Sequence, residues 1–204
     1  MNKPNLYVIA APSGGGKTSL ISALLEQDDR VSLSISHTTR SPRPGETDGV
    51  HYHFVDEETF RNLVEQDAFL EFAQVYDHWY GTSRQSVNRN LEMGLDVLLD
   101  IDWQGARQIK KNFPECCTIF ILPPSLQALR TRLSRRAQDS EEVIDRRMKT
   151  ARVELSHGDE FDFLIIIDNF DQALTDLQSI VRRGKLEPDG QLEKNHDLLA
   201  ELLK

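Results

Sequence analysis

The amino-acid sequence predicts an α/β fold in which a parallel sheet is flanked by helices. Short apolar runs alternate with longer stretches of helical periodicity along most of the 204 residues. This alternation is typical of β–α units, in which a helix returns the chain between parallel strands. Most of the expected strands carry apolar residues on both faces, as in strands covered on both sides. A chain of this length buries roughly 70% of its extended surface, so we expect one domain with small insertions.

Five segments fit the strands of this sheet, and the second of them is more polar than the others. In chain order they are 6–11, 31–35, 97–101, 118–122 and 163–167. The expected helices cover about 17–27, 83–93, 104–112, 125–136, 140–156 and 171–183. The tail from residue 187 is polar and is expected to end in a helix that carries several leucines.

The segment 40–81 interrupts the alternation. It opens with a run of turn-forming residues at 41–45. Two apolar and aromatic segments, 51–55 and 69–76, then resemble strands around a helix for which Asp56 is the expected N-cap. We therefore expect a small inserted α+β lobe here.

Charge and hydropathy exclude two classes of partner. Thirty-three acidic against 24 basic residues give a net charge of −9, whereas a general nucleic-acid binder needs a basic face. A local basic pocket is still compatible with this charge. No apolar run approaches the roughly 20 residues that span a bilayer. The N-terminus lacks the pattern of an export signal, so we expect no membrane partner and a cytoplasmic location.

The cysteines and histidines give no sign of a metal site. Cys116 and Cys117 lead into the expected strand 118–122 and are interpreted as buried structural thiols, with redox sensing as the alternative. Two adjacent thiols without a disulfide framework fit a reducing compartment. His51 and His53 alternate on an expected strand and are interpreted as surface residues rather than zinc ligands.

The segment 11–18 carries a phosphate-binding motif between a strand and a helix. It matches G-x-x-x-x-G-K-[S/T] except at its first position, where alanine stands. The glycines allow successive backbone N–H groups to converge on phosphate oxygens at the helix N-terminus. Lys17 is expected to bridge the β- and γ-phosphates and Thr18 to bind Mg²⁺. The expected triphosphate contacts are Ala11, Pro12, Ser13, Gly14, Gly15, Gly16, Lys17 and Thr18.

Two carboxylates mark the end of the strand 97–101, with Asp100 inside it and Asp102 directly after it. The carboxyl ends of parallel strands face the ligand crevice, so Asp100 and Asp102 are expected near the phosphates. Asp100 is the candidate for holding metal-bound water beside Thr18. A solvated strand end is the alternative for Asp102.

The lobe carries the residues expected for a second ligand. Arg40 and Arg43, with Tyr52 and Tyr80, suit a compact anion such as a monophosphate, because guanidinium groups form paired charge-assisted hydrogen bonds. A carboxylate at Glu71 could accept both N1–H and the exocyclic amine of guanine, a match that adenine does not offer. An exposed position on an amphipathic strand is the alternative for Glu71.

Three further motifs resemble those of guanylate kinases. These are Ser36 to Glu46, Tyr80-Gly81-Thr82 and Leu99 to Gly105. Together with the phosphate-binding loop, the resemblance covers residues 4–184. It implies a P-loop kinase core with a parallel sheet flanked by helices, an inserted GMP-binding lobe and a short helical lid. It also implies transfer of a phosphoryl group from ATP to GMP, and to dGMP, with Mg²⁺.

The resemblance also assigns boundaries and residue roles. The implied core is 4–36, 83–127 and 157–184, the lobe 37–82 and the lid 128–156, followed by the tail 185–204. GMP contacts are implied for Ser36, Arg40, Arg43, Tyr52, Glu71, Tyr80, Thr82, Asp100 and Asp102. ATP-phosphate contacts are implied for Arg132, Arg136 and Arg147. The implied catalytic residues are Lys17, Arg40, Arg43, Arg136 and Arg147.

Two departures from the family pattern concern the ATP side. The lid reads Arg135-Arg136-Ala137 where the pattern has Gly-Arg-Gly, and the last strand is followed by Ile167-Asp168-Asn169 in place of Asn-Asp-Asp.

Two other readings stay open, a non-catalytic peptide-recognition module and a kinase for another nucleoside monophosphate. The sequence leaves the choice between monomer and homo-oligomer undecided.

Overall fold

A five-stranded parallel sheet forms the centre of the computed structural model, which describes residues 4–75, 77–135 and 141–184. The strand order is β2-β7-β1-β8-β9, and every pairing is parallel. The strands are β1 (Leu6–Ala10), β2 (Val31–Ser34), β7 (Asp96–Asp100), β8 (Cys117–Leu122) and β9 (Phe163–Ile166). All five expected strands are therefore confirmed, each within about one residue of its predicted bounds.

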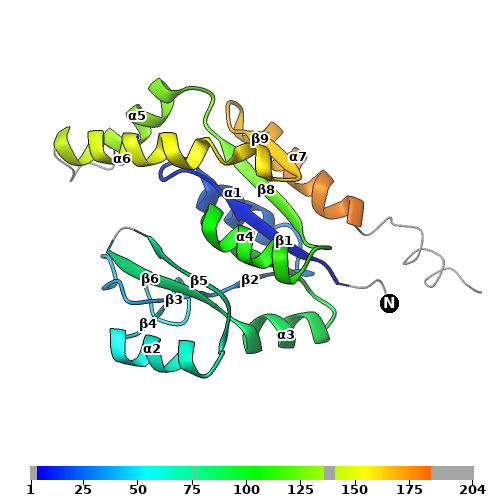
Figure 1. Cartoon of the computed structure of the whole chain (residues 1–204). Helices are drawn as coiled ribbons and strands as arrows, with labels where there is room; N and C mark the ends of the chain where they lie inside the picture. Colours follow the sequence, from blue (N-terminus) through cyan, green and yellow to red (C-terminus); the bar gives the residue numbers. More distant parts are fainter. Residues whose placement is uncertain (1–3, 76, 136–140, 185–204) are drawn as a thin grey trace, which may run out of the picture.

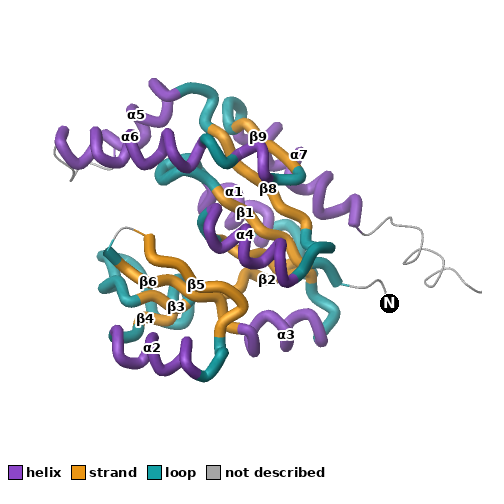
Figure 2. Tube along the Cα trace, in the orientation of Figure 1, coloured by secondary structure: helices purple, strands orange, loops and turns teal. Residues whose placement is uncertain are grey.

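Helices cover both faces of this sheet, as Figures 1 and 2 show. Alternate residues of β1 divide between two apolar clusters, with Tyr7 and Ile9 in one and Leu6 and Val8 in the other. The first cluster contains side chains of α1 (Lys17–Leu25) and α7 (Phe170–Gly184), and the second those of α3 (Arg84–Glu92) and α4 (Trp103–Asn112). The continuous apolar runs of the sequence thus become strands buried on both faces.

A second, four-stranded sheet forms the lobe, in the order β4-β3-β6-β5. Its elements are β3 (His37–Thr38), β4 (His53–Phe54), α2 (Glu57–Glu65), β5 (Phe69–Val75) and β6 (His78–Ser83). Asp56 caps α2 as predicted, because its side chain accepts a hydrogen bond from the Thr59 backbone nitrogen at 2.7 Å. The antiparallel strand β6 was not expected from the sequence, and the predicted strand 51–55 is shorter than expected.

Two further helices, α5 (Leu126–Arg135) and α6 (Glu141–Leu155), pair with each other through their own apolar cluster. In Figure 1 this pair and the lobe lie above and below the central sheet. Gly184 ends the described part of α7, so the leucine-bearing helix expected in the tail lies outside the described residues. None of the described helices combines the length and apolar character needed to cross a membrane.

The two cysteines lie at the start of β8 on the central sheet. Cys116 is buried, Cys117 is half-buried, and neither forms a disulfide. Burial raises the pKa of the Cys116 thiol to about 11 and that of Cys117 to about 12. Both side chains are therefore protonated and unreactive near neutral pH, as expected for structural thiols.

Candidate functional site

A cavity of about 250 Å³ opens at the carboxyl ends of β1 and β7, facing the lobe. The phosphate-binding loop forms one wall. The predicted residues in its lining are Ala11 to Thr18, Ser36, Tyr52, Glu71, Tyr80, Asp100 and Asp102. The structure thus brings together residues from the loop, the central sheet and the lobe. Arg40, Arg43, Thr82, Arg132 and Arg147 are described but do not line this cavity.

Backbone geometry explains the glycines of the phosphate-binding loop. Gly14 and Gly16 have φ angles of +85° and +100°, in the left-handed region that glycine adopts without strain. The turn is closed by a hydrogen bond from the Gly15 nitrogen to the Pro12 oxygen at 2.8 Å. Gly16 is the N-cap residue of α1, so the loop leads directly into a helix N-terminus that favours anions.

Lys17 lies in the first turn of α1 and points towards the end of β7. Its Nζ is 2.5 Å from Asp100 Oδ1 and donates a hydrogen bond to the Ile101 oxygen at 3.0 Å. These contacts hold the ammonium at the boundary between the loop and the carboxyl end of the sheet. A phosphate group in the loop would therefore meet a positive charge that is already in place.

Glu71 is buried at the lobe end of the cavity, with 3% of its surface exposed. Its Oε1 accepts a hydrogen bond from the Thr82 hydroxyl at 2.5 Å. Burial raises the pKa of this carboxyl to about 7, and the charge of Asp102 adds to the shift, whereas the hydrogen bond from Thr82 opposes it. The alternative of an exposed Glu71 is wrong. Ser36 is also buried beside the same cavity.

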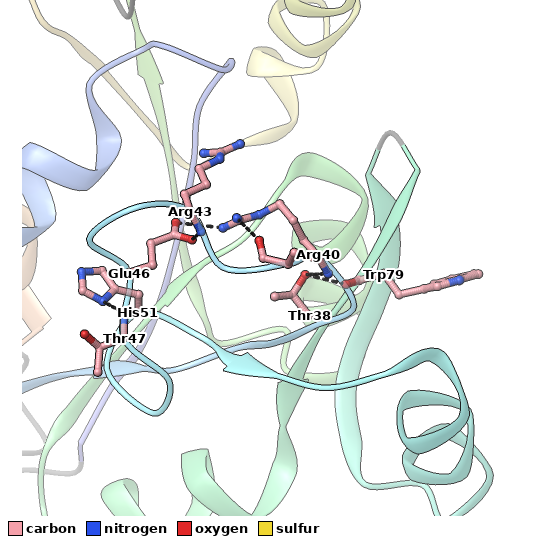
Figure 3. Close-up of polar contacts among 8 residues, drawn as sticks. Thr38, Arg40, Arg43, Glu46, Thr47, His51 and Trp79 are labelled. Carbon is pink, nitrogen blue, oxygen red and sulfur yellow. Dashed lines mark hydrogen bonds and ion pairs between the residues drawn. The ribbon is translucent and has the colours of Figure 1, made fainter. Parts of the chain in front are cut away.

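Arg40 and Arg43 share one carboxylate partner, Glu46, as Figure 3 shows. The Arg40 guanidinium donates to Glu46 Oε1 at 2.8 Å, and the Arg43 backbone nitrogen donates to Glu46 Oε2 at 2.7 Å. Arg40 also lies 5.4 Å from the centre of the Tyr52 ring, which lines the cavity. Glu46 therefore orders the arginine-bearing loop next to the cavity.

The arginines expected to contact ATP phosphates have different positions. Arg132, on α5, donates to the backbone oxygens of Gly15 at 3.1 Å and Ile167 at 2.9 Å, so it connects the loop to the end of β9. Arg147 is half-buried on α6. Arg136 lies outside the described residues.

Sequence reasoning missed Glu154, which α6 brings into the cavity lining. Its Oε2 accepts a hydrogen bond from the Ser13 backbone nitrogen at 3.2 Å. Burial raises the pKa of this carboxyl, although the bond from Ser13 and the charge of Lys17 oppose the shift. The available signal was its spacing, because Glu154 lies three residues after the buried Ala151, on the inner side of α6.

Comparisons with known proteins agree with this geometry. The guanylate kinase family model matches residues 3–184. A guanylate kinase of Alkalilimnicola ehrlichii is 55% identical over 98% of this chain and 96% of its own length, and one of Histophilus somni is 55% identical over 100% and 99%. The crystal structure of guanylate kinase from Anaplasma phagocytophilum has a TM-score of 0.77 at 31% identity, covering 92% of this chain and 89% of that one. The chain therefore belongs to the guanylate kinase family.

Proposed function

We propose that this protein transfers the γ-phosphoryl group of ATP to GMP, and to dGMP, and releases ADP with GDP or dGDP. One observation carries the proposal: a single cavity is lined by a phosphate-binding loop on one wall and by the buried carboxylate of Glu71 on another. The loop suits a triphosphate, and the carboxylate suits a base that presents two neighbouring N–H donors. The cytoplasm is the expected compartment for this reaction on free nucleotides.

Glu71, Ser36 and Thr82 form the proposed guanine-reading group. The Thr82 hydroxyl fixes one carboxylate oxygen of Glu71. In its ionised form Glu71 accepts hydrogen bonds from guanine N1–H and the exocyclic amine. Adenine has no hydrogen on N1, so it would leave a buried acceptor without a partner, and such losses discriminate strongly between ligands.

The phosphoryl groups are held by the opposite wall and by the arginine-bearing loop. The loop amides and Lys17 bind the ATP phosphates, while Arg40 and Arg43, with Tyr52 and Tyr80, hold the GMP phosphate. The attacking oxygen needs no general base, because a phosphate monoester with a second pKa near 6 is already largely ionised at pH 7. Catalysis then depends on alignment and charge compensation, with Arg136 and Arg147 proposed to complete the latter.

The described residues fit a Mg²⁺ ion next to the loop. Thr18 and Asp100 both line the cavity, and hydroxyl and carboxylate oxygens are the ligands that Mg²⁺ prefers. We propose that Thr18 binds the ion directly and Asp100 through water. The ion, when bound, compensates the charge of the ATP phosphates.

We also propose the division of the chain that the family resemblance implies, with a core (4–36, 83–127 and 157–184), a GMP-binding lobe (37–82) and a lid (128–156). The separate sheet of the lobe and the separate apolar cluster of α5 and α6 support this division. Closure of lobe and lid over both substrates would exclude water, which otherwise hydrolyses ATP.

A coupled assay of ADP release tests the proposal across GMP, dGMP, AMP, CMP and UMP. We expect turnover with GMP and dGMP and little with the others. Glu71→Gln should raise the KM for GMP about 5- to 150-fold, since roughly 1–3 kcal/mol is lost when a charge-assisted bond is replaced by a mismatch. The KM for ATP should not change. Equal effects on both substrates, or a preference for AMP, would contradict guanine reading by Glu71.

A further inference from the structure

We infer that two residues of the core helix α4, Gly105 and Gln108, are positioning residues that set the orientation of Glu71 and thereby the preference for guanine. This inference rests on the proposed function of Glu71. It assigns part of base selectivity to the core, outside the lobe that carries the carboxylate.

The first observation concerns the free edge of the lobe sheet. β5 is the last strand in the order β4-β3-β6-β5, so among the described residues no strand pairs with its outer backbone groups. Gln108 supplies partners at one residue: its Oε1 accepts from the Phe72 nitrogen at 3.3 Å, and its Nε2 donates to the Phe72 oxygen at 2.8 Å. A single side-chain amide thus pairs with both backbone groups of the residue that follows Glu71.

The second observation is the close approach of α4 to the carboxylate itself. Gly105 lies one turn before Gln108, on the same side of the helix. A Cβ atom at Gly105 would lie 2.4 Å from Glu71 Oε2 and 3.0 Å from its Cδ. Because Oε1 is held by Thr82 on the other side, the carboxyl group lies between a hydroxyl and the helix backbone, and only glycine leaves it this space.

The third observation is a bulge immediately before Glu71. The pairing of β5 with β6 shifts register between Phe69 and Glu71, which leaves Leu70 as the extra residue. Leu70 is buried in the apolar cluster of the central sheet, together with Ala106 of α4. The residues on both sides of Glu71 are therefore attached to the core, one by apolar packing and one by hydrogen bonds.

These contacts predict a selective defect when either positioning residue is changed. In Gly105→Ala the added methyl group meets the end of a side chain, so the protein can adapt by moving Glu71 and still fold. A displacement of about 1 Å at a reacting or recognition group can cost on the order of 100-fold. We expect Gly105→Ala to raise the KM for GMP about 10- to 100-fold at an unchanged KM for ATP, and Gln108→Ala to have a smaller effect of the same kind.

The test measures kcat/KM for GMP and for IMP, which lacks the exocyclic amine, in variants with and without Glu71. Gly105→Ala and Gln108→Ala should lower the GMP-to-IMP ratio, and both effects should vanish in the Glu71→Ala background. Gly158→Ala is the matched control, because its Cβ would meet nothing closer than 3.5 Å. Melting temperatures identify any variant that fails to fold. If Gly105→Ala or Gln108→Ala does not fold, the inference is tested with the other variant.

Three outcomes would overturn the inference: an unchanged GMP-to-IMP ratio in the folded variants, equal losses for ATP and GMP, or the same loss with and without Glu71. Glu71→Gln is measured in parallel, so that a failure of the positioning inference can be told apart from a failure of the proposed function. A normal KM for GMP in Glu71→Gln would refute guanine reading itself. A selective defect in Glu71→Gln without one in Gly105→Ala or Gln108→Ala would refute only the positioning.

Discussion

The Glu71 carboxyl is buried, and its proposed role in binding guanine requires the ionised form. Burial raises its pKa from 4.5 to about 7. The folded protein therefore binds a proton here more tightly than the unfolded chain does. As a consequence, the contribution of Glu71 to the free energy of unfolding declines as the pH rises from about 4.5 to about 7, and levels off above that range.

GMP binding should follow this titration in the opposite direction. Because guanine needs the ionised carboxylate, the KM for GMP should fall as the pH rises from 6 to 8, by up to about tenfold per pH unit below pH 7. The GMP phosphate also titrates, with a pKa near 6. The titration of the phosphate affects wild type and Glu71→Gln equally. The difference between their profiles of KM against pH therefore reports the titration of Glu71 alone. Parallel profiles would contradict the prediction.

Lys17 should be required for turnover but not for folding. Lys17→Ala removes the positive charge that lies 2.5 Å from Asp100 at the mouth of the loop. Loss of one group that compensates charge in a transition state typically costs about 10²–10³ in kcat, and we expect a loss of at least that size. Lys111→Ala, at an exposed position on α4, is the matched control. Near-normal turnover of folded Lys17→Ala would exclude its proposed role.

At the scale of elements, the phosphate-binding loop and α5 depend on each other through Gly14. A Cβ at Gly14 would lie 2.9 Å from Leu133 Cδ2 and 3.4 Å from Leu129 Cδ1, and the φ angle of +85° adds backbone strain. Both side chains belong to the apolar cluster that α5 shares with α6. A side chain at this position would therefore press on Leu133 and Leu129, which would have to shift to make room for it.

Gly14→Ala should weaken ATP binding while GMP binding is retained. Gly94→Ala is a suitable control, because Gly94 has a φ of +79° but nothing within 4 Å of the added atom. It introduces an alanine at positive φ outside the cavity lining, and so controls for a general loss of stability. Calorimetry with a non-hydrolysable ATP analogue and with GMP separates the two effects. A comparable loss of ATP affinity in Gly94→Ala would show that general destabilisation, and not the change in the loop, is responsible.

The sequence predicted those elements whose residues carry a local signal. Strands such as β1 and β8 are continuous apolar runs, and the loop 11–18 has a fixed spacing of glycine, lysine and threonine. β6 was missed because Gly81 and two aromatic neighbours give it no alternation, and its strand character comes from pairing with β3 and β5. The partners of Arg132 and Glu154 were equally inaccessible, since they depend on how distant helices pack against the loop.

At the scale of the whole molecule, the two nucleotides should bind together. Loop and lobe form separate walls of one cavity, with Glu71 at the lobe end and Lys17 at the loop end. We expect saturation with a non-hydrolysable ATP analogue to leave GMP binding at one site per chain, as measured by calorimetric titration. Displacement of GMP by the analogue would mean that the walls form a single nucleotide site, and the proposed transfer could not occur.

The bulge at Leu70 and the amide of Gln108 fasten β5 to the core on either side of Glu71. Base preference would then not be a modular property of the lobe. A chimaera that received only residues 37–82 from this protein would inherit the carboxylate without its support. To transfer the preference for guanine to another kinase, α4 would have to be transferred together with the lobe.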